Sequence, residues 1–188
     1  MKVRDSGMPD KGMWEDFFNP AGVLARLTLD GNTVNVAEFG CGYGTFTIPA
    51  AKIIRGTIYA LDIEPEMVKT TQDRAAYEGL NNVKTILRDF VDYGSGLKDN
   101  SVDFVMLFNI LHFENPVALL REAYRILTPG GKTGVIHWNY DASTPRGPSL
   151  SIRPKPEQCR DWMKEAGFAL RIPIIQMPPH HYGIVGIK

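Results

Sequence analysis

The sequence predicts an α/β fold, in which a mostly parallel sheet carries helices on both faces and ends in an antiparallel hairpin at its C-terminal edge. Three observations indicate this class. Apolar, β-branched segments alternate with helical patterns through residues 34–138. A glycine-rich stretch follows the first of these segments directly. The last two apolar segments are joined only by "PPHH", a connection short enough for an antiparallel pair.

The alternating part of the chain predicts five parallel strands with helices between them. We expect strands at 34–39, 57–62, 83–88, 102–108 and 132–138, and helices from 47 to about 55, at 65–78 and at 116–126. Asn115 and Pro116 support the last of these helices, because these residue types are favoured at the N-cap and the first helical position. Residues 92–101 should be irregular, and "LTPGGK" at 127–132 should end the helix and turn into the fifth strand.

The chain changes character after residue 138. Residues 139–156 hold four prolines and show no periodicity, which predicts a loop or lid. A helix should follow and end at Gly167, with strands at 168–177 and 182–188 after it. Residues 1–30 are expected to form an N-terminal helical cap. At this length we expect one domain, spanning 1–188.

Composition excludes several classes of function. Lys plus Arg and Asp plus Glu each number 21, without a long run of one sign, which argues against a nucleic-acid partner. The longest apolar run, 104–111, is far shorter than the roughly 18 residues that span a bilayer. No signal-peptide core precedes it, so we expect no membrane partner and a cytoplasmic protein. Cys41 and Cys159 lie far apart, so neither a metal site nor a disulfide framework is expected.

The glycine-rich stretch predicts a site for a nucleotide-like ligand. Glycine permits positive φ and close approach of a ligand, and the helix that follows directs free backbone N–H groups toward it. A nicotinamide site would need GxGxxG and an acid about 20 residues later. Asp62 supplies the acid, but Thr45 or Thr47 stands where the third glycine belongs. The tyrosine–lysine pair of short-chain dehydrogenases and the complete P-loop pattern are both missing.

Five motifs in order resemble the class I methyltransferases that use S-adenosylmethionine. They are "VAEFGCGYG", "LDIEPEM", "LRDF", "MLFNILHF" and "RILTPGGK", which together cover roughly residues 34–138. The chain is most similar to the small-molecule branch that includes ubiquinone/menaquinone-type and arsenite-type enzymes. The resemblance implies a Rossmann-like sheet, S-adenosyl-L-methionine as cofactor and an enzyme that transfers the methyl group to a small-molecule acceptor.

The resemblance also implies a cofactor site, whose residues lie at or just beyond the carboxyl ends of strands. The expected cofactor-binding residues are Glu38, Gly40, Cys41, Gly42, Gly44, Asp62, Ile63, Asp89, Phe90 and Asn109. Glu38 and the glycines would lie beneath the methionine end of the cofactor. Cys41 between them is expected to be a small buried residue and not a nucleophile.

The remaining residues of this set have individual expected roles. Asp62 would accept hydrogen bonds from both ribose hydroxyls, and Ile63 would lie against the adenine face. Asp89 would accept the adenine amino group, with Phe90 beside it. Asn109 would offer its backbone carbonyl to the methionine ammonium.

No catalytic residue is assigned from the sequence. Methyl transfer depends mainly on positioning and on excluding water, and it needs a general base only if the acceptor loses a proton. His137 and His112 are candidates for that base, although a role in helix entry or packing is favoured for His112. His180 and His181 are adjacent, but two neighbouring histidines without further ligands rarely form a metal site.

The acceptor itself is not identified. The Asn/Asp-Pro-Pro-Tyr/Phe motif of enzymes that methylate nucleic-acid amines or glutamine amides is missing after the fourth strand, and two cysteines are too few for arsenite. The acceptor should lie between the N-terminal segment and the 139–156 loop, which we expect to close over it. Trp14, Phe17 and Phe18 are either an aromatic lid or the apolar face of a helix on the core. Arg146 and Arg153 would suit an anionic acceptor, but solvated loop charges are the favoured interpretation.

Two other functions stay open at this point. The chain would also fit a protein that binds S-adenosylmethionine or S-adenosylhomocysteine without turnover. A nicotinamide-dependent oxidoreductase is a more remote alternative, because the third glycine is missing. The sequence carries no signal for the oligomeric state.

Overall fold

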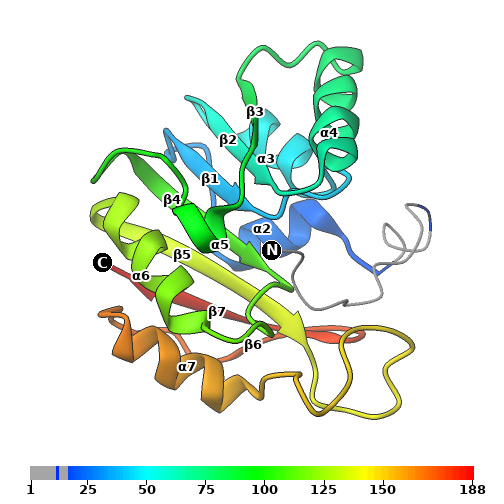
Figure 1. Cartoon of the computed structure of the whole chain (residues 1–188), viewed down its shortest axis with the longest axis vertical. Helices are drawn as coiled ribbons and strands as arrows, with labels where there is room; N and C mark the ends of the chain where they lie inside the picture. Colours follow the sequence, from blue (N-terminus) through cyan, green and yellow to red (C-terminus); the bar gives the residue numbers. More distant parts are fainter. Residues whose placement is uncertain (1–11, 13–16) are drawn as a thin grey trace.

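The computed structural model describes Gly12 and residues 17–188, and it confirms the predicted fold class (Figure 1). Seven strands form one sheet in the order β3-β2-β1-β4-β5-β7-β6. The strands are β1 (Val36–Phe39), β2 (Ile58–Asp62), β3 (Val83–Leu87), β4 (Val102–Phe108), β5 (Leu127–Trp138), β6 (Ile175–Met177) and β7 (His181–Ile187). The first five pair in parallel, and β7 runs antiparallel between β5 and β6.

Helices cover both faces of the sheet (Figure 1). One face carries α2 (Pro20–Arg26), α3 (Thr47–Ile53) and α4 (Pro65–Tyr77), and the other carries α5 (Phe90–Tyr93), α6 (Pro116–Ile126) and α7 (Pro156–Glu165). Four of these helices begin with proline, whose missing N–H costs nothing at a position that has no partner in the helix. Asn19 and Asn115 cap α2 and α6, each accepting a backbone N–H at 3.1 Å. These local signals explain why α6 has the predicted bounds.

The core consists of two apolar layers, one on each side of the central strands. Phe39, Leu107 and Val135 pack beneath the α6 and α7 side, whereas Phe104 and Ile136 pack beneath α2 and α3. Strands β1, β4 and β5 are therefore buried on both faces, as expected for parallel strands. Their carboxyl ends form one firmly supported edge.

Three predicted segments need correction. Strand β5 begins at Leu127 and not at 132, because Leu127 pairs with Val102 before the register shifts. The predicted strand 168–177 is formed only at Ile175–Met177, with an isolated bridge between Ala169 and Ile187. Pro173 lies between these two pairings and cannot donate to a ladder. The segment 92–101 is irregular for the most part, but α5 extends into its first two residues.

The parts of the chain that flank the sheet were predicted less fully. Residues 139–155 contain neither helix nor strand, which agrees with the predicted loop. Of the predicted N-terminal cap, α2 is the helix that falls in residues 17–30, and Trp14 lies outside the described residues. In the described part of the chain, no helix combines the length and apolar character needed to cross a membrane.

Candidate functional site

The glycine loop connects β1 to α3 at the carboxyl edge of the sheet. Gly40, Gly42 and Gly44 adopt φ of +79°, +53° and +74°, a region that side chains other than glycine rarely occupy. A Cβ atom on Gly44 would lie only 3.0 Å from Thr71 Oγ1. The N–H groups of Gly40 and Cys41 both donate to Leu61 O, at 2.8 and 2.9 Å. The loop therefore curls over the end of β2.

Asp62, the last residue of β2, holds this loop in place with a hydrogen bond. Its Oδ2 atom accepts the Gly42 N–H at 2.9 Å, and its Oδ1 atom accepts the Glu64 N–H at 3.0 Å. From the other side, Thr71 Oγ1 donates to Gly42 O at 2.9 Å. Burial raises the pKa of the Asp62 carboxyl, and the backbone N–H groups of Glu64, Gly42 and Ile63 oppose that rise. The loop is thus shaped by contacts within the protein.

Glu38 lies under the same loop and is only 2% exposed. Its carboxyl group accepts a hydrogen bond from the Thr47 hydroxyl at the start of α3. Burial raises the pKa of Glu38 to about 8, against the effect of Thr47 and with a further contribution from the Asp62 charge. Because an adjacent cation favours the ionised form, a positively charged ligand here would lower that pKa again.

Cys41 lies between these groups and is buried. Burial is the main cause that raises the pKa of its thiol, and the nearby Glu38 and Asp62 carboxyls add to it. A thiol that stays protonated is a poor nucleophile. The structure therefore gives Cys41 the properties of a small buried residue.

The side chains of Asp89 and Phe90, which follow β3, both make contacts within the protein. Asp89 caps α5, and its Oδ1 atom accepts the N–H groups of Val91 and Asp92 at 3.1 Å each. The Phe90 ring is buried against the Phe39 ring, with centroids 5.2 Å apart, so this side chain belongs to the core. Ile63 is half-buried in the turn between β2 and α4.

Asn109 follows β4 directly and has an unusual backbone. Its φ of +54° is uncommon for a residue other than glycine, and such strain is often found at functional sites. Its N–H donates to Ile136 O at 2.8 Å and ties the turn to β5. The carboxamide oxygen and nitrogen are both buried, and neither has a hydrogen-bond partner.

All four histidines of the sequence gather near this edge, which the sequence alone did not predict. The rings of His112 and His137 have centroids 5.6 Å apart, and His181 and His180 lie 4.2 and 6.3 Å from the Trp138 ring. The antiparallel pairing of β5 with β7 brings His137, His180 and His181 together, since it sets His137 opposite Tyr182 and Trp138 opposite His181. Among the described residues, no cluster of three or more His, Cys, Asp or Glu side chains suits a metal ion.

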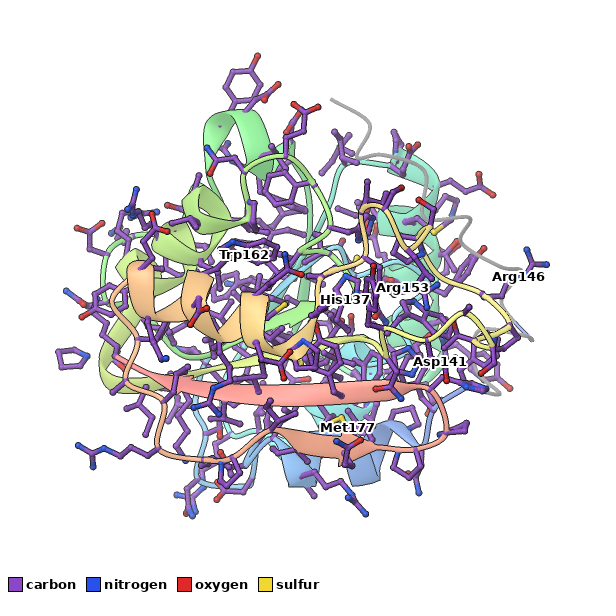
Figure 2. The ribbon with its side chains drawn as sticks, turned by 90° about the horizontal axis from the view of Figure 1, so that it is seen from below. His137, Asp141, Arg146, Arg153, Trp162 and Met177 are labelled. Carbon is purple, nitrogen blue, oxygen red and sulfur yellow. The ribbon has the colours of Figure 1, made fainter. Side chains whose placement is uncertain are left out.

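Arg153 corrects the expectation of a solvated loop charge. It is 7% exposed and lies beside His137, whereas Arg146 is exposed and projects away from the body (Figure 2). The guanidinium group donates to the carbonyl oxygens of Asn139, Asp141, Arg146 and Pro148 and to the Thr144 hydroxyl. The 139–156 loop is therefore wrapped around one buried cation. No sequence motif marks Arg153 or its five hydrogen-bond partners, so the sequence did not predict this arrangement.

Comparison with protein families gives one match over the part of the chain that builds this site. A family model described as "Methyltransferase domain" matches residues 36–131, just over half of the 188 residues. The matched span contains the glycine loop, Asp62, Asp89 and Asn109.

A relative by sequence carries a methyltransferase name, and solved structures share the fold. A demethylmenaquinone methyltransferase of Geobacillus stearothermophilus is 31% identical over 100 residues, which cover 50% of this chain and 40% of that protein. This chain thus spans less than half of that relative. A SAM-dependent methyltransferase structure from Aquifex aeolicus has a TM-score of 0.83 at 23% identity, covering 95% of this chain and 93% of its own. The [4+2]-cyclase SpnF has a TM-score of 0.76 at 20% identity, covering 90% and 79%.

Proposed function

The chain belongs to the methyltransferase-domain family, and from this premise we propose that it is an enzyme that transfers a methyl group from S-adenosylmethionine to a small-molecule acceptor. The observation that carries the proposal is the glycine loop that Asp62 holds over the carboxyl end of β2. Open α/β sheets bind their ligands in this position, next to the strand where the order of connections reverses.

The residues of the site suit this cofactor. Three glycines with positive φ leave room for close approach of a ligand to the backbone, and the Asn109 carboxamide is buried without a partner. The Asp62 carboxylate accepts one N–H on each oxygen, so each oxygen retains capacity for a further hydrogen bond. When bound, the cofactor supplies an electrophilic methyl group on a sulfonium.

We assign the following roles within this proposal. Asp62 accepts hydrogen bonds from the ribose hydroxyls, and Ile63 contacts the adenine ring. Asp89 contributes an acceptor for the adenine amino group in addition to capping α5. For Phe90 the proposal is restricted to its backbone, because the ring packs against Phe39 in the core.

Two further residues act at the methionine end of the cofactor. Glu38, beneath the glycine loop, gives up its proton and faces the positive charge of the bound cofactor. Asn109 offers its backbone carbonyl to the ammonium group. These two residues and the glycine loop orient the methyl group, while burial of the site keeps water away from it.

The acceptor in this proposal is a small molecule, and the reaction takes place in the cytoplasm. Relatives that carry the name demethylmenaquinone methyltransferase support a small-molecule acceptor. Acceptors related to a demethylated menaquinone are therefore the first to be tested.

A protein that binds the cofactor without methyl transfer remains the second candidate. The likeness to SpnF, whose name describes a [4+2]-cyclase, favours keeping it, because similar folds host different chemistry. A nicotinamide-dependent reaction is disfavoured, since Thr45 and Thr47 occupy the places of the third glycine.

Two measurements separate these candidates. Thermal unfolding of the full chain with S-adenosylmethionine, S-adenosylhomocysteine or NAD should show stabilisation by the first two only. Transfer of a labelled methyl group to a library of small acceptors, with reduced naphthoquinones first, should then show turnover. Binding without turnover on any acceptor would favour the second candidate, and stabilisation by NAD alone would contradict both.

A further inference from the structure

Two polar residues at the carboxyl edge of the sheet have buried side-chain nitrogen or oxygen atoms without a hydrogen-bond partner. Both ring nitrogens of His137 are buried without a partner, and the same holds for the two polar atoms of the Asn109 carboxamide. Buried polar groups nearly always have partners, and each exception calls for an explanation such as a ligand or water. We take these two exceptions as the mark of a ligand at this edge of the sheet.

The sheet register places these residues together. Strands β4 and β5 are parallel with Phe108 opposite Ile136, and the Asn109 N–H continues this pairing by donating to Ile136 O. The next pair along the strands is therefore Asn109 and His137. Both lie at the edge where the methyl group of the cofactor is expected, and the ring of His112 lies beside the ring of His137.

The polar groups around His137 are already engaged elsewhere. Tyr182, opposite His137 on β7, donates its hydroxyl to Pro154 O at 3.0 Å and lies 3.2 Å from Cys159 Sγ. Arg153 directs all its described hydrogen bonds into its own loop. Neither group competes for the imidazole.

The same surroundings keep His137 in the form that accepts a proton. Burial is the main cause that lowers its pKa well below the usual value, and the charges of His112, His181 and Arg153 act in the same direction. A weaker contact with the Trp138 backbone opposes this shift. A neutral imidazole has one nitrogen with a free lone pair. Such a group is suited to act as a general base.

We propose that His137 is the general base of the reaction, and that Asn109 and His137 together select an acceptor whose attacked atom is a hydroxyl or amino group carrying a proton. This inference rests on the proposed methyl transfer and specifies the acceptor class of that site. Asn109 hydrogen-bonds the acceptor heteroatom, and His137 binds its proton.

The proposed step conserves atoms and charge. The acceptor heteroatom forms its bond to the methyl carbon with its lone pair, the carbon–sulfur bond breaks, and sulfur keeps the electron pair. The heteroatom passes its proton to the free nitrogen of His137. The positive charge thus moves from the sulfonium to the imidazolium, which releases the proton to solvent after the product leaves.

The fully buried ring sets a condition on this step. His137 has no exposed surface, so the acceptor reaches it only when the segments around the ring separate. In the closed state water has no access, and this favours proton transfer from the acceptor alone.

The test compares fragments with and without the proton, using the full chain labelled with ¹⁵N-histidine, in the presence and absence of S-adenosylhomocysteine. The matched pairs are phenol with anisole, and aniline with N,N-dimethylaniline. Phenol and aniline should shift the His137 ring nitrogens and bind about tenfold more tightly than their methylated partners, as expected for one added hydrogen bond.

Variants then assign the preference to residues. His137→Gln should reduce it to about twofold or less, while the affinity for S-adenosylhomocysteine stays within about twofold of the unmodified protein. Asn109→Gly removes the carboxamide but tolerates the positive φ, and it should also reduce the preference. If His137→Gln fails to fold, Asn109→Gly tests the proposal in its place. His180→Gln, the matched control, should keep the full preference.

Several results would overturn the inference. The paired fragments could bind equally, or none of them could bind. The ¹⁵N shifts could be confined to the ring of His180. The preference for phenol and aniline could also persist in His137→Gln and Asn109→Gly. Failure of the unmodified protein to bind S-adenosylhomocysteine would instead contradict the proposed function on which this inference rests. A fragment preference that persists without that ligand would then show that the failure lies in cofactor binding and not in the acceptor site.

Discussion

The carboxylate of Asp62 accepts the backbone N–H of Gly42 at 2.9 Å, and so joins the end of β2 to the middle of the glycine loop. The sequence analysis gave Asp62 a role toward the ribose only. In the structure the same carboxylate also shapes the loop, because Gly42 is held between Asp62 and Thr71. Replacing Asp62 should therefore disturb two parts of the cofactor site at once.

Asp62→Ala should weaken the binding of S-adenosylmethionine by about 1.5–3 kcal/mol, the range for hydrogen bonds to a charged group. Asp62→Asn keeps an oxygen that can accept one backbone N–H, so it should lose less. Titration calorimetry on both variants measures the difference, after circular dichroism has shown that they fold. An unchanged dissociation constant in Asp62→Ala would remove the assignment of Asp62 to the ribose.

Glu38→Gln should change how stability depends on pH. The pKa of Glu38 is raised to about 8 in the folded protein, from an ordinary 4.5. Between these values the unfolded chain has lost the proton and the folded protein keeps it, so rising pH lowers the free energy of unfolding. The contribution has a slope of up to about 1.4 kcal/mol per pH unit and levels off above the folded pKa.

In the glutamine variant this contribution should be missing between about pH 4.5 and 8. The measurement is urea unfolding across that range, with the difference between variant and unmodified protein plotted against pH. Asp62 and Cys41, the neighbouring titratable groups, are the same in both proteins and largely cancel in the difference. Glu66→Gln, in the exposed first turn of α4, is the matched control. Parallel stability curves for Glu38→Gln and the unmodified protein would contradict the raised pKa.

Arg153→Lys should destabilise the protein by about 2 kcal/mol or more, although it preserves the charge. The guanidinium fork reaches four carbonyl oxygens and the Thr144 hydroxyl, and a single ammonium group cannot reproduce that pattern. Residues 139–153 should also become more sensitive to limited proteolysis. Arg146→Lys in the same loop is exposed and should change stability by less than about 0.5 kcal/mol. Equal stabilities of the two variants would show that the buried cation does not organise the loop.

Truncation before and after the two phenylalanines tests what they contribute. Phe17 contacts the Trp138 ring at 5.3 Å, and Phe18 contacts the rings of Phe46 and His181 at 5.0 and 4.4 Å. Of the two sequence-based alternatives, these contacts favour packing on the core for Phe17 and Phe18. The free energy of unfolding should therefore be about 2 kcal/mol lower for a chain without residues 1–18 than for a chain without residues 1–16.

Methyl transfer by the two truncated chains addresses the lid. If both have lost turnover but still bind S-adenosylmethionine, the predicted lid function belongs to residues 1–16. If the shorter truncation is fully active, residues 1–16 form no lid. Equal stability of the two chains would contradict the packing role of Phe17 and Phe18.

The central elements could be predicted because their signals are local. Strand β4 is apolar except for Asp103, and α6 starts with Pro116 directly after the N-cap Asn115. Both elements have the predicted bounds. The burial of Arg153 could not be predicted in the same way. Four of its five acceptors are backbone carbonyls, which every residue carries, so no residue type announces them.

In the candidate site, only the residues that end a strand or directly follow one in the sequence could be predicted. Asp62 and the glycine loop follow directly from the chain order of β1 and β2. The grouping of His137 with Tyr182 depends on the register of β5 against β7, which sequence alone left open. Phe90 was expected at the ligand because it follows Asp89, but the direction of the short helix α5 turns its ring into the core.

The position of β7 between β5 and β6 has a consequence for synthesis of the chain. Trp138 pairs with His181, 43 positions further along, so β5 is synthesised before the neighbour with which it pairs. Until then one side of an apolar parallel strand has open N–H and C=O groups, which are a template for pairing with other chains. A nascent chain that stalls between these residues would therefore be prone to aggregate, and its protection by a chaperone matters most during this interval.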